Sequence, residues 1–145
     1  MNKKILLSIC VVSIVWLSAC SKPDNSKAHP IVAAYSVSWN EKDVQKMTAL
    51  MHPDIQWLSV TDNTISVEVS GKTELVAEMT EWFDSPNLPA GSLRDWSLNG
   101  NYVAVTETAA WTDKAGTAQS QSSLTVYELE DNLIRRVYYY PSVKN

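Results

Sequence analysis

Residues 93–111 read LRDWSLNGNYVAVTETAAW, and this stretch decides the fold. Asn99-Gly100 is a strong signal for a two-residue hairpin turn. After the turn, every second residue faces the same way, so one side of the segment carries Val103, Val105, Ala109 and Trp111. A period of two is typical of a half-buried strand. The stretch therefore predicts two antiparallel strands, over residues 93–98 and 102–111.

Strand patterns continue on both sides of this hairpin. Residues 117–129 and 133–140 predict two more antiparallel strands, with turns at 113–116 and 130–132. Pro141 then blocks further ladder pairing. Upstream, residues 55–60 predict a strand and residues 65–69 a shorter one.

Three segments have helical spacing instead. Residues 30–39 place Ile31, Val32, Tyr35 and Trp39 on one face. A second helix begins after Asp43 and ends at His52-Pro53, because the residue before proline avoids the helical region. The third covers residues 72–83. Helices gathered on one face of a mostly antiparallel sheet predict a single α+β domain.

The N-terminal sequence has the pattern of a signal that directs export. Lys3 and Lys4 precede an uncharged run of 13 residues from Ile5 to Leu17, which is shorter than the ~20 residues of a membrane-spanning helix. Leu17-Ser18-Ala19-Cys20 resembles the lipobox of bacterial lipoproteins, which implies cleavage before Cys20 and lipid on its sulfur and amine. The alternative is an ordinary signal peptide, or an uncleaved anchor, with a chance cysteine.

This resemblance sets the predicted layout: a signal peptide over residues 1–19, a lipidated Cys20 and tether over 20–28, and a domain over 29–145. Ser21 is not the aspartate that retains lipoproteins in the inner membrane in enteric-type sorting. We therefore expect a lipid-anchored protein on the periplasmic side of the envelope, with the outer membrane favoured.

Composition excludes several functions. Loss of residues 1–19 moves the net charge from −4 to −6, and no basic run remains, which argues against nucleic acid. With Cys10 removed and Cys20 lipidated, no free thiol or disulfide is expected. Only His29 and His52 remain as histidines, and four glycines allow no phosphate loop. We expect neither a metal nor a cofactor.

The element order and several stretches resemble the SnoaL-like branch of the nuclear transport factor 2-like superfamily. The stretches are residues 31–35, 43–57, 71–75 and 124–134. The resemblance implies a cone, in which three helices in the N-terminal half pack on a strongly curved sheet and leave a cavity. It also implies isomerases, cyclases, dehydratases and noncatalytic proteins alike, so the fold alone assigns no function.

In ketosteroid-isomerase-like members of this superfamily, a tyrosine of the first helix donates a hydrogen bond to the developing oxyanion, and Tyr35 aligns with it. The position of their catalytic base falls at Ser59, and the position of their second donor falls near Leu124 and Thr125. Serine without a histidine partner is a poor base at neutral pH. The isomerase mechanism therefore does not carry over, and we expect Tyr35 to be a core or cavity-lining phenol.

Two strand carboxylates could replace the missing base. A carboxylate in a cavity wall can act as acid or base because desolvation raises its pKa. For Glu107 we favour a solvent-facing position on the outer sheet surface, whereas Asp95 is either in a cavity wall or at its rim. Arg135 and Arg136 point to opposite faces, and one of them either binds an anionic ligand in the cone or pairs with Glu128 or Glu130.

Aromatic residues are the expected cavity lining. With Ser59, the predicted ligand-binding residues are Tyr35, Trp39, Trp57, Trp82, Trp111 and Tyr127. Tyr138-Tyr139-Tyr140 alternates faces, so an aromatic stays on the outer sheet surface, where members of the family often dimerise.

Three functions are therefore open. The favoured one is noncatalytic binding of a small, mostly apolar molecule in the cone. The next is a scaffold that binds an envelope protein through the sheet. The last is a SnoaL-type isomerase, cyclase or dehydratase acting on a small hydrophobic carbonyl compound, with Tyr35 as hydrogen-bond donor and Asp95 or Glu107 as base.

Overall fold

Ten elements follow one another in the computed structural model, which describes residues 28–145. They are α1 (Pro30–Asn40), α2 (Val44–Ala49), β1 (Met51–Thr61), β2 (Thr64–Ser70), α3 (Lys72–Phe83), β3 (Ala90–Asn99), β4 (Tyr102–Thr112), β5 (Ala118–Glu130), β6 (Leu133–Tyr139) and β7 (Val143–Lys144). The predicted signal peptide, the lipidated Cys20 and nearly all of the tether lie outside the described residues.

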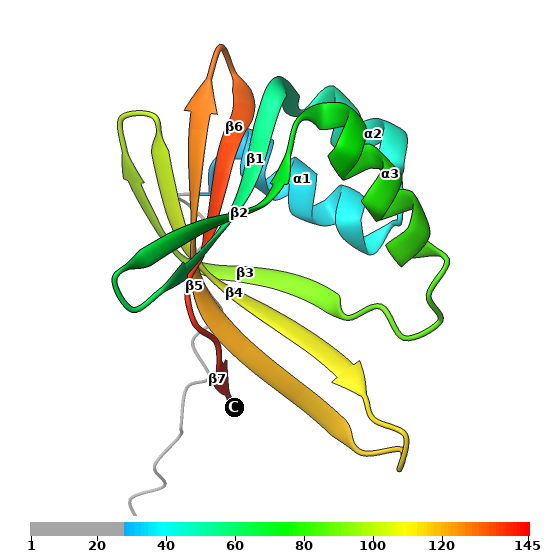
Figure 1. Cartoon of the computed structure of the whole chain (residues 1–145). Helices are drawn as coiled ribbons and strands as arrows, with labels where there is room; N and C mark the ends of the chain where they lie inside the picture. Colours follow the sequence, from blue (N-terminus) through cyan, green and yellow to red (C-terminus); the bar gives the residue numbers. More distant parts are fainter. Residues whose placement is uncertain (1–27) are drawn as a thin grey trace, which may run out of the picture.

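The seven strands form one curved, mostly antiparallel sheet (Figure 1). The strand order is β2-β1-β6-β5-β4-β3, and β7 pairs with the N-terminal half of β5, at Gln121 and Ser122. The pair β1–β6 is parallel, whereas the other pairs are antiparallel. The sequence predicted the α+β class and the order of helices and strands along the chain, but neither β7 nor the strand order within the sheet.

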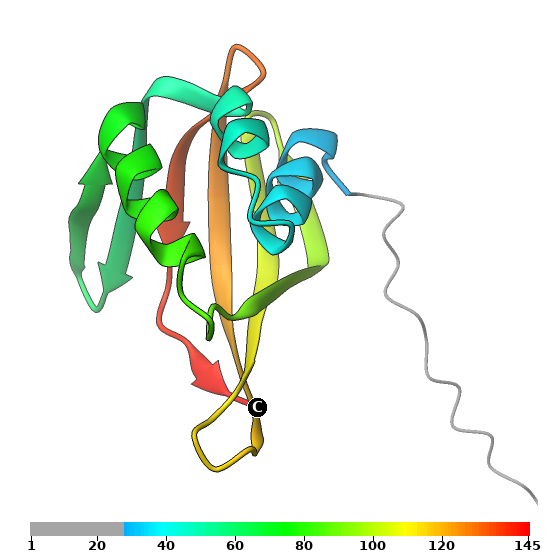
Figure 2. The ribbon, with the colours of Figure 1, turned by 90° about the vertical axis from the view of Figure 1, so that its right-hand side faces the viewer.

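One hydrophobic core joins the helices to the sheet. Figure 2 shows α1, α2 and α3 together on one side of the strands. Helical residues such as Val32, Met47 and Leu75 are fully buried, as are Ile55 and Val105 from the sheet. Burial of apolar side chains from both layers is what holds the helices on the sheet.

The second helix is shorter than predicted. Asp43 caps it, since its carboxylate accepts a hydrogen bond of 2.9 Å from the backbone N–H of Lys46. The helix ends at Ala49, and Met51 and His52 already lie in β1. The prediction was wrong here because an apolar residue at this position fits either a helical stripe or a strand face, and the pairing of Met51 with Ile134 of β6 decides for the strand.

A bulge interrupts β3. The register with β4 shifts between Arg94 and Ser97, and Asp95 has a φ of 56°. A bulge bends its strand and increases the local twist, which curves the edge of the sheet. The hairpin between β3 and β4 was predicted, but the assignment of Asn99-Gly100 as its turn was wrong by one residue. Asn99 pairs with Tyr102 and belongs to β3, so the two loop residues are Gly100 and Asn101.

Candidate functional site

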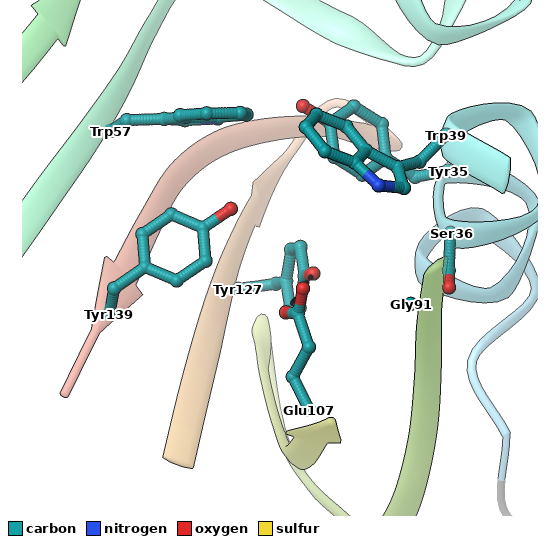
Figure 3. Close-up of a pocket in the computed structure, with 8 residues that line it drawn as sticks. All are labelled: Tyr35, Ser36, Trp39, Trp57, Gly91, Glu107, Tyr127 and Tyr139. Atoms are coloured by element: carbon teal, nitrogen blue, oxygen red, sulfur yellow. Dashed lines mark hydrogen bonds between the residues drawn. The ribbon is translucent and has the colours of Figure 1, made fainter. Parts of the chain in front are cut away.

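A cavity of about 220 Å³ lies between α1 and the inner face of the sheet. It is smaller than the ~300–1,000 Å³ of typical drug-sized sites but larger than the ~150 Å³ engineered cavity that admits benzene. Figure 3 shows the eight residues that line it: Tyr35, Ser36, Trp39, Trp57, Gly91, Glu107, Tyr127 and Tyr139.

The lining comes from six elements of the fold. Tyr35 and Trp39 are one helical turn apart on α1, so both project toward the sheet. The strands β1, β3, β4, β5 and β6 each contribute one residue. Because every second residue of a strand faces inward, each of these strands brings one residue against the space, while α1 closes the opposite side.

Hydrogen bonds attach α1 to β3 at one side of the cavity. The Asn40 amide donates to the Gly91 carbonyl and accepts from the Gly91 N–H, both at 2.8 Å. The indole N–H of Trp39 donates to the Pro89 carbonyl at 3.2 Å. These bonds hold the Trp39 ring in place as part of the wall.

The aromatic rings contact one another around the hollow. The Trp57 centroid lies 5.5 Å from that of Tyr139 and 6.4 Å from that of Trp39. Tyr35 and Tyr127 meet edge to face at 6.3 Å. Such pairs add about 0.5–1.5 kcal/mol beyond area burial, so these rings stabilise each other.

Glu107 is the acidic group of the cavity. Its carboxylate accepts a hydrogen bond of 3.2 Å from the Tyr127 hydroxyl. The residue as a whole is half-buried, yet enough protein surrounds the carboxyl group that burial raises its pKa above the ordinary value of 4.5. The hydroxyls of Tyr127 and Thr125 oppose that shift. A carboxyl group with a raised pKa in a cavity is suited to proton transfer or to pairing with a cation.

Two further polar groups of the cavity wall lack partners. Within residues 28–145, neither the buried Tyr35 hydroxyl nor the buried Trp57 indole N–H has a hydrogen-bond partner of good geometry, although the Trp57 N–H lies near enough to the Tyr35 oxygen to influence its pKa. Burial raises the pKa of Tyr35 far above its usual range, the nearby Trp57 opposes the shift, and the charge of Glu107 adds to it. Buried donors without partners are uncommon and costly, so a ligand acceptor beside the Tyr35 hydroxyl would be favoured.

The expectation that Glu107 faces solvent was wrong. Val103, Val105 and Glu107 are two residues apart along β4, and both valines are buried. The same period that predicted the strand therefore places Glu107 inside, and this alternation was the signal that could have identified it.

Asp95 does not reach the cavity. It is exposed at the β3 bulge, where its carboxylate pairs with the neighbouring Arg94. The bulge inserts a residue and changes which face each side chain takes, so counting along the strand could not locate it.

Of the seven predicted ligand-binding residues, four line the cavity: Tyr35, Trp39, Trp57 and Tyr127. The other three do not. Trp82 stacks on the side of Trp57 at 5.4 Å and supports it. Trp111 lies beside a separate hollow near the β4–β5 turn. Ser59 is half-buried in β1 and pairs with Ser66 and Tyr139.

Three lining residues were missed: Ser36, Gly91 and Tyr139. Tyr139 has the clearest signal, because Val137 two positions earlier is an apolar residue of the same strand face and is fully buried. Ser36 and Gly91 carry no such signal, since they line the space only through the approach of α1 to β3.

The two arginines of β6 lie outside this cavity lining. Arg136 pairs with Glu128 at 2.7 Å on the neighbouring strand, and Arg135 lies 3.3 Å from Glu130. The cross-strand alternative is thus confirmed. Within residues 28–145, no group of three or more His, Cys, Asp or Glu side chains is placed to hold a metal, and no helix is long and apolar enough to cross a membrane.

A curved sheet, three helices and a cavity between them define an α+β domain of the nuclear transport factor 2-like class. A family model described as a SnoaL-like domain matches residues 32–137. The chain belongs to the SnoaL-like family. No curated protein matches it.

Solved structures with the same fold have diverse descriptions. An NTF2-like protein of unknown function from Cytophaga hutchinsonii is 15% identical, with 78% of this chain and 96% of that chain covered and a TM-score of 0.59. A hypothetical protein with a ketosteroid isomerase-like fold from Catenulispora acidiphila, in complex with trimethylamine, is 14% identical, with 79% and 86% covered and a TM-score of 0.63. An epoxide hydrolase from M. tuberculosis is 15% identical, with 79% and 82% covered and a TM-score of 0.63. At these identities the likeness shows the fold alone.

Proposed function

We propose that this chain is a lipid-anchored envelope protein whose SnoaL-like domain binds a small, mostly apolar molecule in the cavity. The observation that carries the binding proposal is the lining of the cavity, in which aromatic rings surround Glu107 and the unpartnered hydroxyl of Tyr35. Apolar walls with a few convergent polar groups are typical of small-molecule sites. The anchoring and the periplasmic location rest on the N-terminal sequence ending at Cys20.

Binding is tested with the full-length protein. Native mass spectrometry reports any copurified small molecule, and a thermal-shift screen of small apolar compounds reports stabilisation, because a ligand that binds only the native state raises the melting temperature. Ser36→Phe places a ring in the cavity and is expected to abolish the shift. Val37→Phe is the matched control, since Val37 is the next residue of α1 and is 54% exposed. The proposal fails when no molecule copurifies and no compound stabilises the protein.

A second candidate is the enzyme alternative, and the position of Glu107 favours it. Glu107 would take a proton from the carbon next to a ligand carbonyl. The C–H electron pair would form a C=C bond, the C=O π pair would move to the oxygen, and the Tyr35 hydroxyl would donate a hydrogen bond to that oxygen. Exchange of these protons of small hydrophobic ketones in D₂O, followed by NMR, tests this. Exchange that Glu107→Gln leaves unchanged would rule Glu107 out as the base.

We also propose that the outer face of the sheet mediates self-association or binding of another protein. Tyr102, Leu124 and Tyr140 are 49%, 47% and 39% exposed, on β4, on β5 and just after β6. The backbone of Tyr140 bonds to that of Leu124, so these two lie on adjacent strands. Light scattering of the full-length protein tests self-association, with Leu124→Glu as the variant expected to keep it monomeric.

A further inference from the structure

The cavity contains one acidic group and no basic group. Glu107 is the only residue among the eight lining residues that can carry a full charge near neutral pH. The arginines on β6 are engaged elsewhere, by Glu128 and Glu130. The carboxylate therefore has the Tyr127 hydroxyl at 3.2 Å as a neutral partner. A desolvated carboxylate gains most from a cation that enters beside it.

The rings around Glu107 suit a cation as well. Trp39, Trp57 and Tyr139 line the same space, and Figure 3 shows the Tyr139 hydroxyl and the Glu107 carboxylate converging on it. The face of an aromatic ring carries negative charge density and attracts an ammonium group, and this attraction is stronger in a desolvated site. Walls of this kind with a carboxylate are the arrangement that binds alkylated ammonium ions.

The unpartnered donors add a second requirement. The Tyr35 O–H and the Trp57 N–H are buried without partners in the described part of the chain. The Trp57 N–H lies near the Tyr35 oxygen, so the donor left for a ligand is the Tyr35 O–H, which requires an oxygen or another acceptor on the ligand. A purely hydrocarbon amine leaves that donor unpaired, whereas an amine that also has a hydroxyl or carbonyl oxygen satisfies it.

We propose that the ligand is a small organic ammonium ion bearing one oxygen acceptor, with its charge paired to the Glu107 carboxylate, its N-alkyl groups against Trp39, Trp57 and Tyr139, and its oxygen toward the Tyr35 hydroxyl. This inference rests on the proposed binding function and adds the class of ligand.

Two probes of equal shape separate charge from size. Choline carries a quaternary ammonium and a hydroxyl, and 3,3-dimethylbutan-1-ol replaces its nitrogen by carbon and is neutral. Isothermal titration of the full-length protein is expected to show choline binding at least about tenfold more tightly, because a desolvated cation–π contact and an ion pair are both lost with the alcohol. Quenching of tryptophan fluorescence provides a second readout, since Trp39 and Trp57 line the cavity.

Variants then assign the charge effect to one residue. Glu107→Gln is expected to weaken choline binding at least about tenfold and to leave the alcohol unaffected, which also reports that the variant is folded. Glu68→Gln, an exposed position on β2, removes the same charge outside the cavity and should leave both probes unaffected. Glu107→Asp keeps the charge one methylene further back and should retain part of the choline affinity.

The pH dependence gives an independent readout. Choline binding should strengthen as pH rises through the raised pKa of Glu107, while alcohol binding should not. The other titratable groups that face Glu107 are Tyr35 from α1, Tyr127 from β5 and Tyr139 from β6, and burial raises the pKa of each phenol, so they stay neutral over this range. A choline affinity that is flat from pH 4 to pH 8 would count against the proposal.

The outcomes separate this inference from the function on which it rests. Equal or tighter binding of the alcohol, or choline binding unaffected by Glu107→Gln, overturns the ammonium proposal while small-molecule binding stands. Absence of binding by both probes, together with a screen that stabilises nothing, overturns both.

Discussion

Replacement of Glu107 by glutamine should make the free domain more stable at neutral pH, although it removes a charged hydrogen-bond acceptor. Burial raises the pKa of Glu107 in the native state above 4.5, its value in an exposed chain. Between these two values the native protein holds a proton that the unfolded chain has released. Its free energy of unfolding therefore falls as pH rises, by up to about 1.4 kcal/mol per pH unit for one proton. The native state therefore keeps its full stability with respect to this group below pH 4.5, and loses part of it as pH rises through the raised pKa of Glu107.

Glutamine keeps the shape and the contact to Tyr127 but does not ionise. The stability difference between Glu107→Gln and wild type should be smallest near pH 4 and should grow with pH in favour of the variant. It should become constant once Glu107 is fully ionised. Urea unfolding followed by tryptophan fluorescence at half-unit steps from pH 4 to pH 8 measures this difference. The exposed Glu68→Gln should follow the wild-type curve.

Parallel stability curves for Glu107→Gln and wild type would refute the reasoning, because they would mean that Glu107 binds protons equally in the folded and unfolded states. The reasoning would be refuted more strongly if the free energy of unfolding of the wild type rose relative to that of the variant as pH increased. That result would place a positive charge near Glu107, where the described residues place phenols.

Three further substitutions test the cavity wall and the core. Tyr127→Phe removes the hydroxyl that donates to Glu107 and should lower the free energy of unfolding at pH 7 by about 1–3 kcal/mol, measured in urea; an unchanged midpoint would show that this bond contributes nothing. Asn40→Ala removes both hydrogen bonds to Gly91, so it should lower the free energy of unfolding by about 1–3 kcal/mol in the same assay and weaken binding in the cavity. Unaltered stability and affinity would mean that these two bonds do not position α1. Met79→Ala leaves a void in the core under α3 and should cost about 2–5 kcal/mol; a loss below 1 kcal/mol would show that the helix closes onto the space.

Local patterns in the sequence predicted most of the fold. Alternation in residues 102–111 and the turn before it placed β3 and β4, and helical spacing placed α1 and α3. The errors occurred where tertiary pairing decides between two local conformations. Met51 completes a helical stripe in the sequence, but in the structure it pairs with Ile134 from the far end of the chain.

The candidate site was predicted in part, for a related reason. Large aromatic residues such as Trp39 and Trp57 are recognisable as lining because they carry too much apolar area to remain in solvent. Gly91 has no side chain from which a role in the cavity could be predicted. It lines the cavity because Asn40 binds its backbone. Asp95 was misplaced because a bulge is set by the partner strand as well as by its own residues.

The parallel pairing of β1 with β6 has a consequence for how the chain is made. Gln56 and Arg136, which bond across this pair, are 80 residues apart. Until the C-terminal residues are available to pair with it, during synthesis and any export, β1 therefore keeps one edge open. Contacts between such distant residues slow folding, and an open strand edge is a site of intermolecular association in the meantime. Premature termination before residue 133 would leave that edge unpaired for good, and we expect such fragments to aggregate or be degraded rather than to persist as smaller domains.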